Sequence, residues 1–174
     1  VPLQTRDRVI GLIYVDMHNL IRTFSEEDLD LLTVMANVAA IRIEQTRLAE
    51  IEQAEKMLAR DLSQAAEIQR GLLPPGPPSV AGLDVDGHNL PCRTIGGDYY
   101  DYFVYPDGRL GIVVADVAGK GMPAALMMSS LQAYVQVLAN TNASPAMVAE
   151  RLNRMITARC PPHRFITFFI ATID

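Results

Sequence analysis

The sequence has few of the features that mark several large classes of protein. Its 174 residues include only two cysteines, Cys92 and Cys160, whose spacing suits neither a disulfide scaffold nor a metal site and fits a reducing compartment. The net charge is -5 and basic runs are absent, so nucleic acid is not a favoured partner. No apolar run approaches the about 20 residues that span a bilayer. We therefore expect a cytoplasmic protein without membrane insertion.

Histidines and phosphate-binding signatures give no further lead. His18, His88 and His163 are scattered along the chain, and we expect loop or surface roles for them. The Gly-Lys-Gly segment at 119–121 is not a P-loop, because the G-x-x-x-x-G-K-[ST] frame is absent. Arg93 is equally compatible with contact to a substrate phosphate and with a solvated surface position.

Helix-breaking residues are missing from a long central stretch. Between Glu26 and about Leu73 there is no proline and no glycine except Gly71. This predicts one helix, or two nearly continuous ones, of roughly 45 residues and on the order of 65–70 Å. Ser25 is the predicted N-cap, with Asp28 completing a capping box. Four prolines in the following segment, LLPPGPPSVAG, end the helix and mark a domain boundary.

Mostly apolar residues, interrupted by a few polar ones, form a seam along this predicted helix, stepping by threes and fours. The seam comprises Leu31, Val34, Val38, Ile41, Gln45, Leu48, Ile51, Glu55, Leu58, Leu62, Ala65, Gln69 and Leu72. Two steps of three fall together around Leu48, which is a stammer in a coiled-coil repeat. Two interpretations stay open: a solvated linker with accidental heptads, or a dimeric helix that changes register or pitch.

The two ends of the chain read as strands. Residues 8–16, RVIGLIYVD, predict a buried strand, and the strand-like pattern starts almost at residue 1. The final apolar run, FITFFIATID, is also strand-like. Because a strand needs a neighbour for its backbone groups, we expect a fragment of a longer protein. Charges interrupt the first apolar stretch and no cleavage pattern follows it, so a signal peptide is not expected.

After the prolines, short apolar runs alternate with turn residues, which predicts an α+β fold. Pro123 suits the first turn of a helix, and Ser144 with Pro145 forms a helix start. The predicted elements are a strand in 83–92, a strand–turn–strand hairpin in 98–117 with a Pro-Asp-Gly turn, helices in 124–139 and 145–159, and a strand in 164–174.

Two acidic clusters flanked by glycines occur in this part of the chain. The first, Gly96–Asp101, contains Asp98, and the second is Asp116–Gly121. An antiparallel hairpin brings Asp98 and Asp116 together, and glycines let the backbone approach a ligand closely. Three interpretations stay open: a divalent cation between the repelling carboxylates, an ion pair with Lys120, or ordinary turn residues beside loops.

Three motifs resemble a known family in their order and spacing. EIQRGLLP (67–74), GGDYYD (96–101) and ADVAGKGMPAALMMS (115–129) resemble the bacterial PPM/PP2C-type serine/threonine phosphatase domain of the SpoIIE/RsbU group. The resemblance extends over about residues 62–174. The residues before the linker resemble the last strand and C-terminal helix of a GAF sensor domain. The expected domains are the end of a GAF domain at 1–45, a coiled-coil linker helix at 46–73, and the first part of a PP2C-like α/β sandwich at 74–174.

The resemblance implies a phosphatase that holds two Mn²⁺ or Mg²⁺ ions. These ions activate a water that attacks phosphoserine or phosphothreonine directly, without a phosphoenzyme. By position, Asp98 and Asp116 match acidic ligands, with Asp116 bridging, and the carbonyl of Val117 matches the backbone ligand. The expected supporting residues are Gly96, Gly97, Asp101, Gly119 and Gly121. Further aspartates of the family lie downstream of Asp174, so this chain is expected to hold about half of the metal ligands.

Two functions follow as competing hypotheses. The first is a signalling enzyme, in which a GAF domain acts through a paired linker helix on a phosphatase. Its implied substrate is a phosphoprotein, namely a STAS-type anti-sigma-factor antagonist, and its implied assembly is a homodimer. The alternative is a catalytically silent phosphatase-like head on a dimeric helical interaction module. Aspartates in strand-end loops beyond residue 174 would favour the enzyme.

Overall fold

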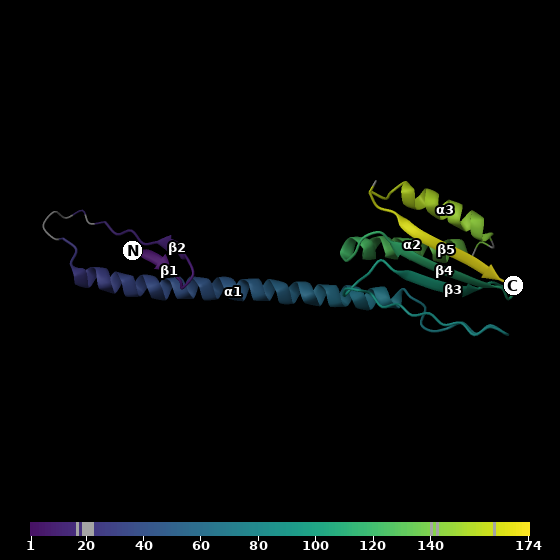
Figure 1. Cartoon of the computed structure of the whole chain (residues 1–174), viewed down its shortest axis with the longest axis horizontal. Helices are drawn as coiled ribbons and strands as arrows, with labels where there is room; N and C mark the ends of the chain where they lie inside the picture. The colour runs from purple at the N-terminus through teal and green to yellow at the C-terminus, as the bar shows by residue number, and fades with distance from the viewer. Residues whose placement is uncertain (17, 19–22, 140, 142, 162) are drawn as a thin grey trace. The chain divides into compact units, whose positions relative to one another are not determined.

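The computed structural model describes residues 1–16, 18, 23–139, 141, 143–161 and 163–174 (Figure 1). The chain forms two compact units, Val1–Ala59 and Arg60–Asp174. Helix α1 (Glu26–Gly71) contributes residues to both units. None of the helices in the described ranges combines the length and the apolar character needed to cross a membrane.

The N-terminal unit pairs a short hairpin with the first part of α1. Strands β1 (Pro2–Gln4) and β2 (Val9–Leu12) are antiparallel. The predicted strand in 8–16 is therefore present, but the expectation that it is buried was wrong: Leu12 is 72% exposed. The two strands of this sheet are too short to enclose a core. An ion pair of Arg8 with Glu44, 3.1 Å long, joins the hairpin to the helix.

Helix α1 is one continuous helix, as the absence of breakers predicts. The backbone N–H of Asp28 donates to the Ser25 hydroxyl at 3.2 Å, and the Ser25 N–H donates to the Asp28 carboxylate at 3.0 Å. This reciprocal pair is the predicted capping box. The helix ends at Gly71, immediately before the proline segment. Most apolar seam residues up to Leu58 are exposed.

The C-terminal unit is built on a three-stranded antiparallel sheet of order β3–β4–β5 (Figure 1). Strands β3 and β4 form the predicted hairpin, and β5 runs along the other side of β4. The predicted α+β class is confirmed. The elements are β3 (Tyr99–Val104), β4 (Leu110–Val117), α2 (Met122–Ala139), α3 (Pro145–Thr157) and β5 (Ile166–Ile173).

The core of this unit lies between one face of the sheet and the two helices. Period-two alternation turns Tyr99, Val113, Ala115 and Val117 toward the helices, and all four are buried. The helix side chains packed in the same cluster are Ala124, Met128, Leu131, Val135, Leu138, Val148 and Leu152. The other face of the sheet is open, with Val114 and Phe169 more than half exposed. This open face contains Asp98 and Asp116.

The strand predicted in 83–92 is not formed. Only an isolated bridge between Val80 and Leu83 occurs at its start. The segment is instead tied to β3 by single bonds that involve side chains: Tyr100 Oη donates to the Gly87 carbonyl at 2.9 Å, and Asn89 Nδ2 donates to the Asp98 carbonyl at 3.1 Å. Residues 84–92 form no continuous hydrogen-bond ladder with β3. The segment is therefore irregular despite its alternating apolar residues.

Candidate functional site

The two acidic clusters meet at one end of the β3–β4 hairpin. The register pairs Tyr99 with Ala115, so Asp98 and Asp116 extend this pairing by one residue on each strand. Asp116 lies two residues after the exposed Val114, and its side chain shares the open face of the sheet because side chains alternate. Both aspartates are exposed. The hairpin thus brings together two carboxylates that are 18 residues apart in sequence.

A hollow of about 460 Å³ contains this pair on the open face. Three strands and the segment before β3 contribute to its wall. The lining residues are His88, Asn89, Leu90, Asp98, Tyr99, Tyr100, Val114, Ala115, Asp116, Thr167, Phe168 and Phe169. The two carboxylates therefore lie in a concavity whose other lining is mostly apolar and aromatic, with the polar side chains of His88, Asn89 and Thr167 added, which is the usual composition of a small-ligand site.

The two carboxylates influence each other electrostatically. Although Asp98 is exposed as a residue, partial burial of its carboxyl group raises its pKa, and the negative charge of Asp116 and a hydrogen bond with that side chain raise it further. Among the residues that the structure describes, Lys120 forms no ion pair with either carboxylate. The ion-pair interpretation is thus not supported, and the like charges lack a protein cation between them.

Glycine at position 97 is required by close packing beside Asp98. A Cβ atom there would lie 2.9 Å from the Val117 carbonyl oxygen and 3.2 Å from the Ala124 Cβ. The Val117 N–H donates to the Gly97 carbonyl at 3.4 Å. The backbone before Asp98 is therefore pressed directly against the backbone after Asp116, and any larger residue would separate the two acidic segments.

Two glycines shape the loop between Asp116 and helix α2. Gly119 and Gly121 have φ values of 114° and 72°, a conformation that side chains strongly disfavour. Arg164 lies against this loop, and its Nη1 donates to the Ala118 carbonyl at 3.4 Å. The loop is thus a tight turn held from the β5 side, and it fixes the backbone that follows Asp116.

Asp101 lies on the opposite face of the sheet from the aspartate pair. It is 4% exposed and faces α2, where its carboxylate accepts from Tyr99 Oη and Gln136 Nε2, both at 2.6 Å. The N–H of Tyr102 donates to its other oxygen at 2.8 Å. These contacts give Asp101 a structural role within β3, and it does not lie in a loop beside the predicted ligands.

Several residues of the site carry no signal in the sequence. Asn89 lies in the hollow, and its side-chain oxygen is buried and has no hydrogen-bond partner among the described residues. Thr167 Oγ1 donates to the Asp116 carbonyl at 3.2 Å. Gln69 belongs to the helix seam and to the motif at 67–74, and neither pattern indicates that its amide bonds the Gly96 backbone. These contacts depend on pairing between distant segments, which spacing along the chain does not reveal.

The donor set suits part of a site for a hard divalent cation. Mg²⁺ and Mn²⁺ prefer carboxylate and carbonyl oxygens, and the two repelling carboxylates would be neutralised by such an ion. The Asn89 side-chain oxygen, which has no hydrogen-bond partner among the described residues, is a further acceptor in the lining of the hollow. Within the described ranges, however, no group of three or more acidic, histidine or cysteine side chains converges. The described residues of this site could therefore supply only part of the ligands that a bound cation needs.

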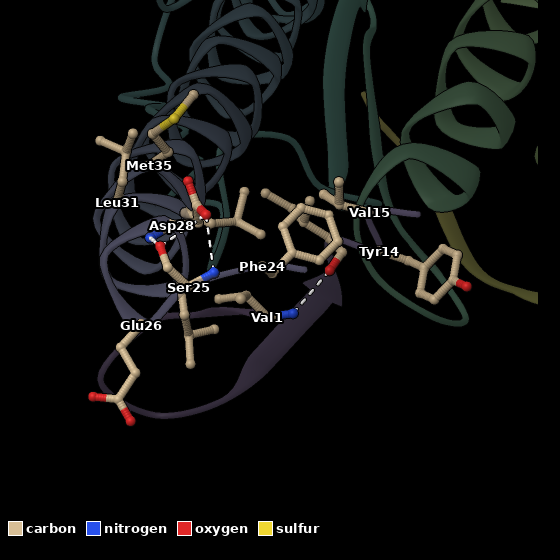
Figure 2. A pocket seen from close by; sticks show the side chains of 12 residues that line it. Val1, Tyr14, Val15, Phe24, Ser25, Glu26, Asp28, Leu31 and Met35 are labelled. Atoms are coloured by element: carbon tan, nitrogen blue, oxygen red, sulfur yellow. Dashed lines mark hydrogen bonds between the residues drawn. The ribbon is translucent and has the colours of Figure 1, made fainter. Parts of the chain in front are cut away.

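A larger hollow, of about 570 Å³, lies in the N-terminal unit (Figure 2). Its wall is formed by Val1, by residues after β2, and by the first turns of α1, with Phe24 and Tyr14 beside it. The polar groups there serve the local structure: Ser25 and Asp28 form the helix cap, and the amino group of Val1 donates to the Ile13 carbonyl at 2.8 Å. This hollow is lined mainly by apolar side chains, and the polar groups just named are engaged in local hydrogen bonds, so its described lining indicates no catalytic site.

Comparison with known proteins identifies the C-terminal unit. Residues 106–174 match the family model of stage II sporulation protein E (SpoIIE). The chain is 34% identical over 120 residues to phosphoserine phosphatase RsbU of Bacillus subtilis (strain 168), covering 69% of this chain and 36% of that protein. This part of the chain belongs to the SpoIIE/RsbU-type PP2C domains. The segment matching the SpoIIE family includes Asp116 and Val117 and begins after Asp98.

One further curated relative and one solved structure are also similar to this chain. Phosphoserine phosphatase RsbP of the same organism is 30% identical over 95 residues, which is 55% of this chain and 23% of that protein. The SiaA-PP2C domain of Pseudomonas aeruginosa has a TM-score of 0.55 at 22% identity, with 70% of this chain and 50% of that chain covered, and it supports the PP2C-like fold. The chain spans about a third of the RsbU length, and its resemblance to a GAF domain stays a prediction.

Proposed function

We propose that the chain is part of a metal-dependent protein serine/threonine phosphatase of bacterial signalling. The observation that carries the proposal is the pair of Asp98 and Asp116, juxtaposed in a hollow, with no ion pair to either carboxylate from any residue that the structure describes. The names of RsbU and RsbP, both phosphoserine phosphatases, support the same reaction. The substrate class is then a protein that carries phosphoserine or phosphothreonine.

In this proposal, the residues of the hairpin end hold two Mn²⁺ or Mg²⁺ ions. When bound, such ions supply an activated water and stabilise negative charge on the phosphoryl group. Asp98 and Asp116 would contribute carboxylate oxygens, and Val117 would contribute its carbonyl. Gly97 permits the close approach of the Asp98 and Val117 backbones, and the glycine loop after Asp116 keeps that carbonyl in place.

The regulation and partners form the finer part of the proposal. A GAF domain at the N-terminus would act through α1, whose exposed apolar seam would pair with a second copy of the chain. We infer a phosphorylated STAS-type anti-sigma-factor antagonist as the substrate, because the family resemblance implies it. The likeness to RsbU supports this partner class without identifying the protein.

The deciding experiment is phosphate release from a phosphoserine protein by the full-length chain in the presence of Mn²⁺. Wild type, Asp116→Asn and Asp107→Asn are compared; Asp107 lies in the exposed hairpin turn and serves as the charge-matched control. We expect Mn²⁺-dependent release by wild type and Asp107→Asn, and a loss of at least about 100-fold in Asp116→Asn. Equal rates for wild type and Asp116→Asn would refute the assignment of Asp116.

The alternative function, a silent phosphatase-like head on a helical interaction module, is favoured by one observation. Only two acidic side chains gather at the hollow in the described part of the chain, fewer than a closed metal site needs. Full-length protein that binds a partner through α1, but releases no phosphate from any phosphoserine protein with Mn²⁺ or Mg²⁺, would support this alternative.

A further inference from the structure

Gln69, in the last turn of α1, holds the backbone of Gly96 through both ends of its side-chain amide. Its Nε2 donates to the Gly96 carbonyl at 2.8 Å, and the Gly96 N–H donates to its Oε1 at 3.0 Å. Both bonds are partly buried and join residues 27 positions apart. The amide thus supplies the donor and the acceptor that a neighbouring strand would otherwise give to this backbone.

The segment held in this way leads directly into the acidic site. Gly96 is followed by Gly97, whose carbonyl accepts from Val117 and whose Cα lies tightly against the Val117 carbonyl, and then by Asp98. Gln69 itself does not line the hollow. A displacement of Gly96 would therefore move Asp98 and disturb the contact between Gly97 and Val117, although Gln69 hydrogen-bonds neither carboxylate.

The packing of the helix end fixes the position of the Gln69 amide. The N–H groups of Leu72 and Leu73 donate to the carbonyls of Gln69 and Arg70 at 3.1 and 3.2 Å, and Leu73 packs against the core. Gln69 Nε2 also lies 3.6 Å from the Met128 sulfur in α2. Hydrogen bonds weaken steeply with distance and angle, so loss of this amide frees both backbone groups of Gly96 at once.

We propose that Gln69 is a positioning residue for the metal site, because its amide sets the backbone from Gly96 to Asp98 against Val117. The inference rests on the proposed function. An apolar residue of similar length at position 69 removes the side-chain partners of the partly buried Gly96 N–H and carbonyl, and the segment relaxes away from Val117. Cation binding then weakens, while the reaction of the fully loaded enzyme changes little.

The test compares Mn²⁺ binding to full-length wild type, Gln69→Met, Gln69→Glu and Gln64→Met, measured by calorimetry and by the Mn²⁺ electron paramagnetic resonance signal. Gln64 is exposed five residues earlier on the same helix and provides the matched control. Gln69→Glu keeps an acceptor for the Gly96 N–H and loses the donor to its carbonyl. We expect the dissociation constant for Mn²⁺ to rise about tenfold in Gln69→Met, less in Gln69→Glu, and not in Gln64→Met.

Two further readouts separate positioning from general damage. At saturating Mn²⁺, the kcat of Gln69→Met should return to within about twofold of wild type, with the KM for phosphoprotein unchanged. Hydrogen exchange at the Gly96 amide should accelerate while exchange in β4 stays slow. Gln69→Met with wild-type Mn²⁺ affinity overturns this inference alone. Wild type and Asp116→Asn that both fail to bind Mn²⁺ overturn the proposed function and this inference together.

Discussion

Without a bound cation, the negative charge of Asp98 lowers the stability of the fold, because its carboxylate is close to that of Asp116. Folding raises its pKa through partial burial and through that neighbour, which means that the charged form is disfavoured in the native state. We therefore predict that Asp98→Asn raises the Tm of the metal-free protein at neutral pH, by about 2 °C since the group is exposed. Thermal unfolding followed by circular dichroism measures the change.

The turn residue Asp107 provides the control for this prediction. Its pKa is lowered by Arg109, so that its charge is favoured by the fold, and Asp107→Asn should not raise the Tm. Added Mn²⁺ should then stabilise the wild type more than Asp98→Asn, because the ion binds a native ligand that the variant lacks. An unchanged or lowered Tm for metal-free Asp98→Asn would contradict repulsion at this pair.

Tyr99 makes the stability of the fold depend on pH in the alkaline range. Burial, the hydrogen bond to Asp101 and the negative charge of that residue raise the pKa of Tyr99 above its ordinary value near 10. The native state therefore retains a proton that the unfolded chain loses above about pH 10, and stability declines as the pH rises beyond that value.

Tyr99→Phe is the variant that tests this dependence. It should lower stability at neutral pH by about 1–3 kcal/mol, because the buried Asp101 carboxylate loses one of its partners. Between about pH 9.5 and 11, urea unfolding should show a smaller further loss in the variant than in wild type. Tyr14→Phe, at a residue that is 79% exposed, should match wild type at every pH. Parallel pH curves for Tyr99→Phe and wild type would contradict the role of Tyr99.

At the scale of elements, the contact between the loop before β3 and the end of β4 determines whether the aspartates stay together. Gly97→Ala places a methyl group 2.9 Å from the Val117 carbonyl and forces the two segments apart. We predict a loss of about 1–3 kcal/mol in stability and weaker Mn²⁺ binding. Gly76→Ala, where nothing lies within 4 Å of the new methyl group, should change neither quantity. Chemical unfolding and calorimetric titration measure both.

Most elements could be predicted because their signals are local. The proline-free run defines α1, Ser25 and Ser144 cap helices, and the Pro-Asp-Gly turn fixes the β3–β4 hairpin and brings Asp98 to Asp116. The strand expected in 83–92 has similar apolar alternation, but its bonds go to single groups of β3 rather than to a ladder. Period-two patterns report burial, and strand pairing requires a partner that the pattern does not name.

The parts of the site that escaped prediction all depend on long-range contacts. The bonds between Gln69 and Gly96 join a helix end to a loop, and Thr167 reaches Asp116 only because β5 pairs with β4 in one register. Asp101 lies on the face of the sheet that packs against the helices, and the alternation of side chains predicts this once the start of β3 is known. A shift of one residue in that start would have exchanged the faces of Asp101 and Tyr100.

At the scale of the whole molecule, the exposed seam on the first part of α1 has consequences for assembly. Leu31, Val34, Val38 and Ile41 are each more than half exposed, and they repeat with coiled-coil spacing. A second copy of the chain presents the same seam, so pairing in parallel would cover these side chains symmetrically. The proposed signalling route from the N-terminal unit to the phosphatase domain requires such a paired helix.

Charge placed within the seam should therefore dissociate the full-length protein. We predict that Ile41→Glu shifts the dimer–monomer equilibrium toward monomer by about tenfold or more, because a carboxylate would be buried at the helix interface. Ile43→Glu is the matched control: Ile43 is 50% exposed and lies about 200° around the helix from Ile41. Sedimentation velocity over a range of concentrations distinguishes the variants. Equal behaviour of the two glutamate variants, or a monomeric wild type, would exclude the seam as the dimer interface.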